Sequence, residues 1–125
     1  MATRYPFKTA TGEELIPVSD GEFFTDIIDG GSYGECYFAF YDSDGETLLG
    51  AESASNITGT IEVLSAPIEG QFMAPARWGV INAADVAVAN YTPPSFPSIV
   101  VQSKAILSGV SGAAYIKGFH WRAGE

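Results

Sequence analysis

Cysteine and histidine are nearly absent from this sequence, which contains one of each, Cys36 and His120. One cysteine cannot form an internal disulfide or a zinc site built on several cysteine ligands, so stability must come from packing or assembly. Hydrolytic enzymes usually need a base, most often histidine, beside a nucleophile. His120 lies in an alternating run between Phe119 and Trp121, where a packed or surface strand residue is expected. The sequence therefore predicts no enzymatic activity, no cofactor and no metal.

Long apolar runs are also absent. Residues 80–91 form the longest weakly polar stretch, and Asn82, Asp85 and Asn90 interrupt it. This is far short of the roughly 20 apolar residues that a transmembrane helix requires. Residues 1–11 have no apolar run, so no secretory signal is expected. We predict a soluble chain with no membrane partner.

Basic residues are few: 6 lysines and arginines face 15 aspartates and glutamates, and the net charge is −9. Nucleic-acid binding needs clustered Lys and Arg to neutralise phosphates, so no nucleic-acid partner is expected. Residues 1–62 contain 12 of the acids and only two bases, whereas residues 63–125 contain 3 acids and 4 bases. Two interpretations remain open: the charges solvate the surface of one fold, or they polarise it and orient the protein against a partner.

The acidic residues raise two chemical hypotheses. Carboxylate pairs drawn from Asp26, Asp29, Glu35 and Asp42 could in principle hydrolyse a glycosidic bond, but nothing in the sequence requires a raised pKa at any of them. The segment Asp42–Glu46 begins like a calcium-binding loop and lacks the distal glutamate. A simple turn is the expected structure there.

Alternation of apolar and polar residues is the dominant pattern in this sequence. The clearest runs predict strands over Glu35–Tyr41, Thr58–Ser65, Ile99–Ser108 and Ala114–Arg122, and weaker runs predict strands over 14–18, 22–28, 78–82 and 86–90. A chain of 125 residues has the length of one domain. We predict an all-β fold, a single antiparallel β-sandwich of jelly-roll type with about seven to nine short strands, over residues 13–125. Residues 1–12 would form an extended N-terminal arm.

Glycine-containing connections predict two hairpins. Residues 42–45 form a polar turn that leads into residues 46–49, and Gly45 can take the left-handed conformation of that turn. Residues 108–112 would join the last two strands in the same way. Residues 82–89 could form at most one or two helical turns, because they contain β-branched residues and prolines follow.

Two proline-rich loops, Ala66–Ala76 and Tyr91–Ser98, interrupt the strand pattern and carry the aromatic residues Phe72, Tyr91 and Phe96. Such loops normally lie on the surface. Their rings either cover an open end of the sandwich or contact a partner. Phe72, Tyr91 and Phe96 are therefore candidate partner contacts.

A carbohydrate-binding module for adhesion to a host surface is an alternative function. β-Sandwiches often bind sugars on exposed aromatic residues, here Trp78, Tyr91 or Trp121. Against this alternative, Trp121 shares a strand face with Tyr115 and Phe119, which is the pattern of a core face.

Three features follow one another in the last third of the chain. The proline-rich loop Tyr91–Phe96 is followed by Lys104–Ala113, a strand that ends in Leu-Ser-Gly-Val before a Ser-Gly-Ala loop, and then by an aromatic terminal strand. This succession resembles small virion structural proteins of tailed bacteriophages. The resemblance implies a capsid decoration or cement protein, a head fibre or a small tail component, commonly trimeric, and it transfers no catalytic residues.

The resemblance leads to a functional expectation. The chain would be a capsid decoration protein on the outer surface of a virion, bridging subunits of the major capsid protein and forming a homo-oligomer, with a trimer favoured. A small tail or head–tail component is the alternative. The arm residues Arg4, Tyr5 and Phe7 would lie across a neighbouring subunit, so removal of residues 1–8 should weaken attachment and leave the domain folded.

Overall fold

The computed structural model describes residues 3–122, without the side chains of Ala74 and Pro97. These residues form β1 (Thr3–Lys8), β2 (Ile16–Pro17), η1 (Val18–Asp20), β3 (Glu22–Thr25), β4 (Ser32–Tyr41), η2 (Ala51–Asn56), β5 (Thr58–Ala66), β6 (Ala74–Asn82), α1 (Ala83–Ala87), β7 (Ser95–Val100), β8 (Gln102–Ser111) and β9 (Tyr115–Arg122). Residues 1–2 of the expected arm and residues 123–125 of the expected domain lie outside the described residues.

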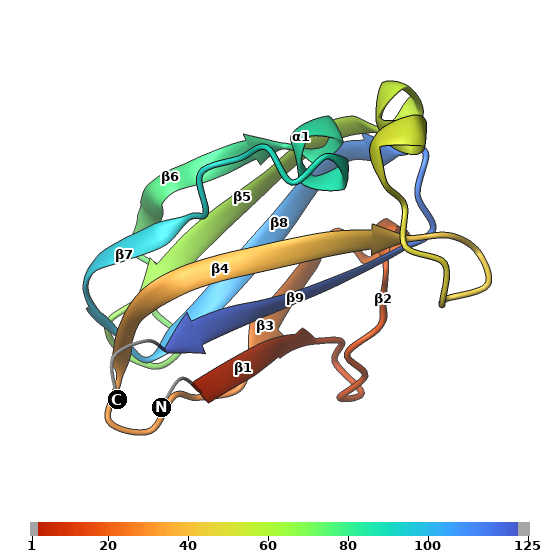
Figure 1. Cartoon of the computed structure of the whole chain (residues 1–125). Helices are drawn as coiled ribbons and strands as arrows, with labels where there is room; N and C mark the ends of the chain where they lie inside the picture. Colours follow the sequence, from red (N-terminus) through yellow and green to blue (C-terminus); the bar gives the residue numbers. More distant parts are fainter. Residues whose placement is uncertain (1–2, 123–125) are drawn as a thin grey trace.

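Eight of the strands form a closed antiparallel barrel, shown in Figure 1. Around the barrel the order is β1, β3, β8, β5, β6, β7, β4 and β9, and β9 pairs with β1 to close the ring. The short β2 also pairs with β9. The all-β antiparallel prediction is confirmed, but the sandwich is wrong. Alternation has the same period in both architectures, so the pattern does not distinguish them.

Strands β1 and β6 join the two sides of the barrel, because each pairs with different neighbours along its length. Thr3–Pro6 of β1 pair with β9, whereas Phe7 and Lys8 pair with β3. Arg77 of β6 pairs with Ser95 of β7, while residues on either side of Arg77 pair with β5. These two strands close the gaps that a sandwich would leave open.

The extended arm expected over residues 1–12 is wrong for residues 3–8, which form β1. Phe7 is fully buried, with its ring centroid 5.5 Å from that of Phe23 and 5.4 Å from that of Phe38. A strand paired on both sides, with a ring in the core, belongs to this fold and does not reach across to a neighbour.

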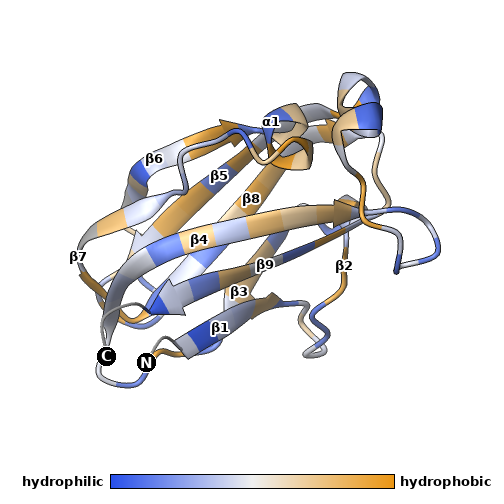
Figure 2. Cartoon of the chain, viewed as in Figure 1, coloured by the Kyte–Doolittle hydropathy of each residue, from blue (hydrophilic) through white to orange (hydrophobic). Residues whose placement is uncertain are grey.

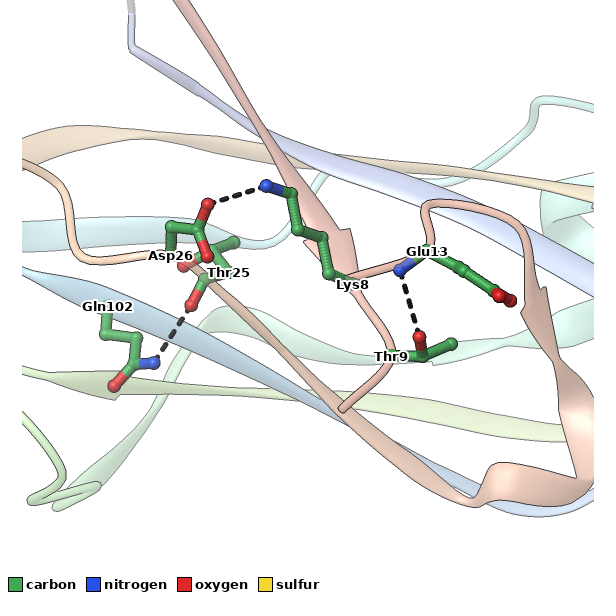
Figure 3. A network of polar contacts seen from close by, with 6 residues as sticks. All are labelled: Lys8, Thr9, Glu13, Thr25, Asp26 and Gln102. Carbon is green, nitrogen blue, oxygen red and sulfur yellow. Dashed lines mark hydrogen bonds and ion pairs between the residues drawn. The ribbon is translucent and has the colours of Figure 1, made fainter. Parts of the chain in front are cut away.

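Polar contacts connect β1 and β8 to β3 and the residue that follows it, as Figure 3 shows. Lys8 Nζ donates to Asp26 Oδ2 at 2.7 Å, and Gln102 Nε2 donates to the Thr25 carbonyl oxygen at 2.9 Å. The Thr25 hydroxyl accepts from the backbone N–H of Ser103 at 3.1 Å. Lys8, Thr25, Asp26 and Gln102 line an open cleft of about 520 Å³. Because these groups bind one another, we interpret them as fastening β1 and β8 to β3.

Most expected strands are confirmed. The runs at 35–41, 58–65 and 114–122 are β4, β5 and β9, and the weaker runs at 14–18, 22–28 and 78–82 contain β2, β3 and part of β6. The strand expected at 86–90 is wrong. The helical alternative for residues 82–89 is confirmed by α1, which is little more than one turn.

The strand expected over Ile99–Ser108 is wrong as one element, because the backbone breaks at Val101 between β7 and β8. β7 pairs with β4 and β6, whereas β8 pairs with β3 and β5. The chain therefore changes sides of the barrel at this residue. Residues 95–98 belong to β7 and not to the expected proline-rich loop, and β6 begins at position 74, inside the other expected loop.

The first expected hairpin is confirmed in part. Gly45 has a φ of 72°, and the backbone N–H of Asp42 donates to the Thr47 carbonyl oxygen at 2.9 Å. The returning segment makes an isolated bridge between Leu48 and Tyr41 and does not form a strand.

The second expected hairpin, over residues 108–112, is wrong. β8 lies between β3 and β5, while β9 lies between β4 and β1. Residues 108–111 belong to β8, and the chain crosses from one side of the barrel to the other over residues 112–114.

Apolar side chains fill the barrel, and Figure 2 shows hydrophobic colour along β5 and β8 and a hydrophilic tip after β4. The inward positions of β4 and β9 are buried: Cys36, Phe38, Phe40, Ile116, Gly118 and His120. Gly118 faces Phe38 across the strand pair, and a Cβ at Gly118 would lie 2.5 Å from the Phe38 ring. Glycine at this position lets the ring lie flat against the backbone.

Candidate functional site

His120 lies in the barrel interior and is fully buried. Its Nδ1 lies 2.8 Å from Ser103 Oγ, and its Nε2 lies 3.1 Å from both Ser32 Oγ and the Tyr33 carbonyl oxygen. The Phe96 ring stacks on the imidazole at 5.0 Å between centroids. Burial lowers the pKa of His120, and the Tyr33 carbonyl opposes this effect. The imidazole is therefore neutral near pH 7 and serves the core.

Cys36 faces His120 in the β4–β9 register and is also fully buried. Burial raises the pKa of its thiol, and a hydrogen bond with Ser103 opposes the rise. A protonated, enclosed thiol is unreactive, because the thiolate is the nucleophile.

The acidic turn after β4 satisfies its own polar groups. Asp44 Oδ1 accepts from the backbone N–H groups of Glu46 at 2.9 Å and Thr47 at 2.8 Å. The Thr47 hydroxyl, followed by these N–H groups, lowers the pKa of Asp44. Within the described residues, no group of three or more His, Cys, Asp and Glu side chains could hold a metal ion.

The outward side of β4, β9 and β1 carries a surface that we call the aromatic face, which consists of Arg4, Tyr37, Tyr41, Lys117, Phe119 and Trp121. Strand register gathers these side chains, because Tyr37 is opposite Phe119 and Arg4 is opposite Trp121. The expectation that Trp121 and Phe119 belong to a core face is therefore wrong. The predicted alternation is confirmed, but the inward set contains Gly118 and His120, and the outward set contains the large rings.

Close ring contacts order the aromatic face. The Tyr37 centroid lies 5.5 Å from that of Phe119 and 6.1 Å from that of Trp121. The Arg4 guanidinium lies 4.7 Å from the Phe119 centroid, and Lys117 Nζ lies 5.4 Å from the Tyr41 centroid. Two shallow depressions, of about 260 and 210 Å³, open between these side chains. Partial burial raises the pKa of Tyr37, and Glu35 adds to the rise.

A second surface lies between β6, α1 and the segment that leads to β7. This Trp78 groove has a volume of about 310 Å³ and is lined by Trp78, Val80, Asn82, Asp85, Asn90, Tyr91 and Thr92, with Ile81 beneath. Trp78 is 59% exposed and has a φ of 59°. The Tyr91 hydroxyl accepts from the backbone N–H of Phe38 at 3.1 Å, which fixes one wall of the groove.

The candidate partner contacts at the N-terminus fall on both sides of β1. Arg4 is exposed on the aromatic face. Tyr5 lies opposite His120, and the two rings form an edge-to-face pair with their centroids 6.3 Å apart. Phe7 is wrong as a partner contact, because its ring is buried in the core.

The candidates from the proline-rich segments also separate. Phe96 is wrong as a partner contact, because it is buried against His120. Phe72 is half-buried and packs on Phe24 with their centroids 5.5 Å apart. Tyr91 lines the Trp78 groove. The structure thus brings none of these three together with Arg4.

The charge asymmetry along the chain does not form one basic surface. Lys104 on β8 lies 3.4 Å from Glu22 on β3, whereas Lys117 projects from β9 beside Tyr41. Strands β8 and β9 lie on different sides of the barrel, so the bases of the second half are dispersed.

Sequence reasoning missed Tyr37 and Phe119 as surface residues. Residues 35–41 carry aromatic side chains at both inward and outward positions, and this double pattern was the available signal.

Searches against family models, curated proteins and solved structures find no match to this chain. In the described part of the chain, no helix is long and apolar enough to span a membrane. The resemblance of the last third of the chain to phage virion proteins therefore stays a prediction.

Proposed function

We propose that this chain is a non-enzymatic structural protein of a tailed-phage virion and that it attaches to the major capsid protein through the aromatic face. The observation that carries the proposal is the cluster of Tyr37, Phe119 and Trp121 on the outside of a closed barrel, with Arg4 beside it. Tyr, Trp and Arg are the residues that most often dominate the binding energy of protein interfaces.

The barrel itself favours attachment by a face. A closed ring of strands removes the long free edges on which a partner strand could pair. The rings of the aromatic face come from regular, paired strands, so they are already ordered before binding. Preorganised side chains lose less conformational entropy on association.

Charge suggests the character of the partner surface. The aromatic face carries the cations of Arg4 and Lys117 in a protein whose net charge is −9. An acidic or neutral surface on the capsid subunit would complement these two cations, while the rest of the acidic protein would disfavour other orientations. A tail or head–tail protein is the second candidate partner, and a second copy of this chain, in the expected trimer, is the third.

Co-sedimentation with bare shells of the major capsid protein tests the proposal. The double variant Phe119→Ala/Trp121→Ala should bind about tenfold or more weakly, because it removes two of the three clustered rings. Tyr33→Ala is the matched control, since Tyr33 is 58% exposed and lies outside the aromatic face. Sedimentation velocity of the free protein measures self-association in parallel. Undiminished binding of the double variant to shells would contradict the proposal.

A further inference from the structure

We infer that the Trp78 groove binds an uncharged oligosaccharide. This inference is independent of attachment through the aromatic face, because the two surfaces share no residue and come from different strands. It rests on three features of the groove, which are its two aromatic walls, its polar groups and its backbone strain.

The two aromatic walls have different roles. Trp78 projects from β6 with 59% of its surface exposed, which leaves the indole available for stacking against a sugar ring. Tyr91 is half-buried and is held through its hydroxyl by the Phe38 N–H. Indole and phenol rings combine an apolar body with a polar tip, which suits a ligand whose faces are apolar and whose edges are hydroxyls. The groove thus has one projecting ring and one fixed ring as its walls.

The polar groups of the groove are suited to hydroxyl ligands. Asn82 Nδ2 and Asp85 Oδ2 are 3.5 Å apart, a long contact that leaves much of their hydrogen-bonding capacity unused. The exposed side chains of Asn90 and Thr92 make no hydrogen bond to another described residue. Amide, carboxylate and hydroxyl groups together donate to and accept from sugar hydroxyls, each of which does both. Asp85 is the only ionisable acid or base among the lining residues apart from Tyr91.

Backbone strain is concentrated at this groove. Among the described residues that are not glycine, only Trp78 and Ala89 have a positive φ, at 59° and 54°. Trp78 lines the groove and Ala89 directly precedes Asn90, which also lines it. A bulky residue with positive φ is a genuine outlier, and such strain gathers at ligand-binding positions.

The local pairing of β6 explains how Trp78 is lifted outward. From Glu62 to Leu64 along β5, the partner residues on β6 run from Val80 to Pro75, so extra residues of β6 bulge out of the pairing. Arg77 and Trp78 are both exposed, although neighbours in a regular strand point to opposite faces. A glycine would adopt the backbone of position 78 without strain. Tryptophan at this position is strained, and its ring is placed over the groove.

Charge and size narrow the ligand class. Asp85 in the groove and the Arg77 guanidinium, 5.6 Å from the Trp78 centroid, have opposite charges, so the net charge of −9 of the whole protein is what disfavours phosphate, sulfate and carboxylate groups here. The volume of about 310 Å³ lies at the lower end of the range for small-molecule sites. A neutral oligosaccharide that lies with part of its length across the groove fits both limits.

Intrinsic fluorescence in a Trp121→Phe background provides the test, because Trp78 is then the only tryptophan. The probes are maltotetraose, cellotetraose, mannotetraose and xylotetraose, with 3′-sialyllactose as the anionic comparison. We expect at least one neutral probe to shift the Trp78 emission and to saturate below about 10 mM, a weak affinity typical of a small open site. Sialyllactose should bind about tenfold more weakly than that probe, because of its carboxylate.

Variants separate binding from folding, with calorimetric titration of the same probe as the readout. Trp78→Gly should weaken binding about tenfold or more, while its melting temperature stays unchanged or rises because the strain is relieved. Asn82→Ala should weaken binding about threefold or more through lost hydrogen bonds. Trp121→Ala is the matched control and should bind the probe normally. No response to any neutral probe at about 10 mM, or equal binding by Trp78→Gly, would overturn the inference.

Discussion

The two tryptophans of this chain lie on surfaces that are built in opposite ways. Trp121 extends from a regular strand, half-buried, 6.1 Å from the Tyr37 centroid. Trp78 extends from a bulge, is 59% exposed, and has the Arg77 guanidinium 5.6 Å from its ring centroid. The first surface needs no backbone strain and offers a broad set of rings, as a protein partner requires. The second accepts strain to place one ring over a groove, as a small ligand requires.

The comparison also shows how one barrel can present two aromatic surfaces. Strands β4 and β9 bury Phe38 and His120 on one side and present Tyr37 and Trp121 on the other. Strand β6 gains an exposed ring only where its pairing with β5 is interrupted. Regular pairing thus builds the aromatic face, and irregular pairing builds the Trp78 groove.

The largest expected effect comes from removing residues 1–8, because β1 carries Arg4 and closes the barrel that supports both surfaces. The deletion removes pairing with β3 and β9 together with the buried Phe7 ring. Loss of one buried Phe ring alone costs about 3–5 kcal/mol, against a total stability of about 5–15 kcal/mol for such a domain. We expect an unfolded or molten chain, measured by circular dichroism and by the reactivity of Cys36 towards a thiol reagent.

Full-length protein is the control, since its enclosed Cys36 should react only after unfolding. A truncated chain that melts cooperatively near the full-length temperature, with Cys36 still protected, would restore the arm interpretation.

Gly118→Ala should destabilise the β4–β9 pair beneath the aromatic face. Its Cβ would lie 2.5 Å from the Phe38 ring, so β4 and β9 must separate or the ring must move. Overpacking of this kind costs about 1–3 kcal/mol. Urea denaturation measures the loss, and binding to shells should weaken. Gly50→Ala is the matched control, because its Cβ would approach only the end of the Glu52 side chain, at 3.4 Å. Equal stabilities of the two variants would show that β9 has room for a side chain at 118.

Acidification should destabilise the side of the barrel beneath the aromatic face. The folded pKa of His120 lies below the unfolded value of 6.5 because of burial. The unfolded chain therefore binds a proton first as pH falls, and stability is lost below pH 6.5 by up to about 1.4 kcal/mol per pH unit until the folded pKa is reached.

Urea denaturation between pH 7.5 and 5 measures this slope, and His120→Gln is the comparison variant. The variant is expected to be less stable overall, with a flatter dependence on pH in this window. A wild-type stability that is constant from pH 7 to 5 would show that His120 can be protonated without cost in the folded state.

The smallest effects are those of the two tryptophans on stability. Trp121→Ala should cost about 1 kcal/mol, because a half-buried ring and its contact with Tyr37 are lost. Trp78→Gly relieves a left-handed strain of about 1–2 kcal/mol and adds the entropy cost of glycine, about 0.5–1 kcal/mol, so its stability should be equal or slightly higher. The midpoints of urea denaturation compare the stabilities of these two variants directly. A loss of stability at position 78 larger than at position 121 would reverse the contrast between the two surfaces.

The sequence predicts much of this fold through alternation, and its failures have physical causes. Strands β4, β5 and β9 follow from period-two patterns. No glycine or proline marks the break at Val101, although the apolar run of residues 99–101 gives way there to polar residues as the chain changes sides of the barrel. Barrel closure depends on β1 pairing with strands distant in sequence, and no local pattern encodes such a partner.

The two surfaces differ in how far they could be anticipated. Trp78 and Tyr91 are recognisable as sugar-binding candidates by residue type, but only the structure places them in one groove with Asn82. The sequence predicts the wrong face for Trp121, because large rings suggest a core when the opposite positions hold Gly118 and His120. The positive φ of Trp78 has no signature in the sequence.

Co-sedimentation of Trp121→Ala and Trp78→Gly with bare capsid shells, side by side with the unmodified protein, shows which of the two surfaces attaches to the shell. Trp121→Ala should lose about tenfold or more in shell binding, whereas Trp78→Gly should bind as the unmodified protein does. Equal binding by all three proteins, or a loss confined to Trp78→Gly, would contradict the assignment of the aromatic face to attachment.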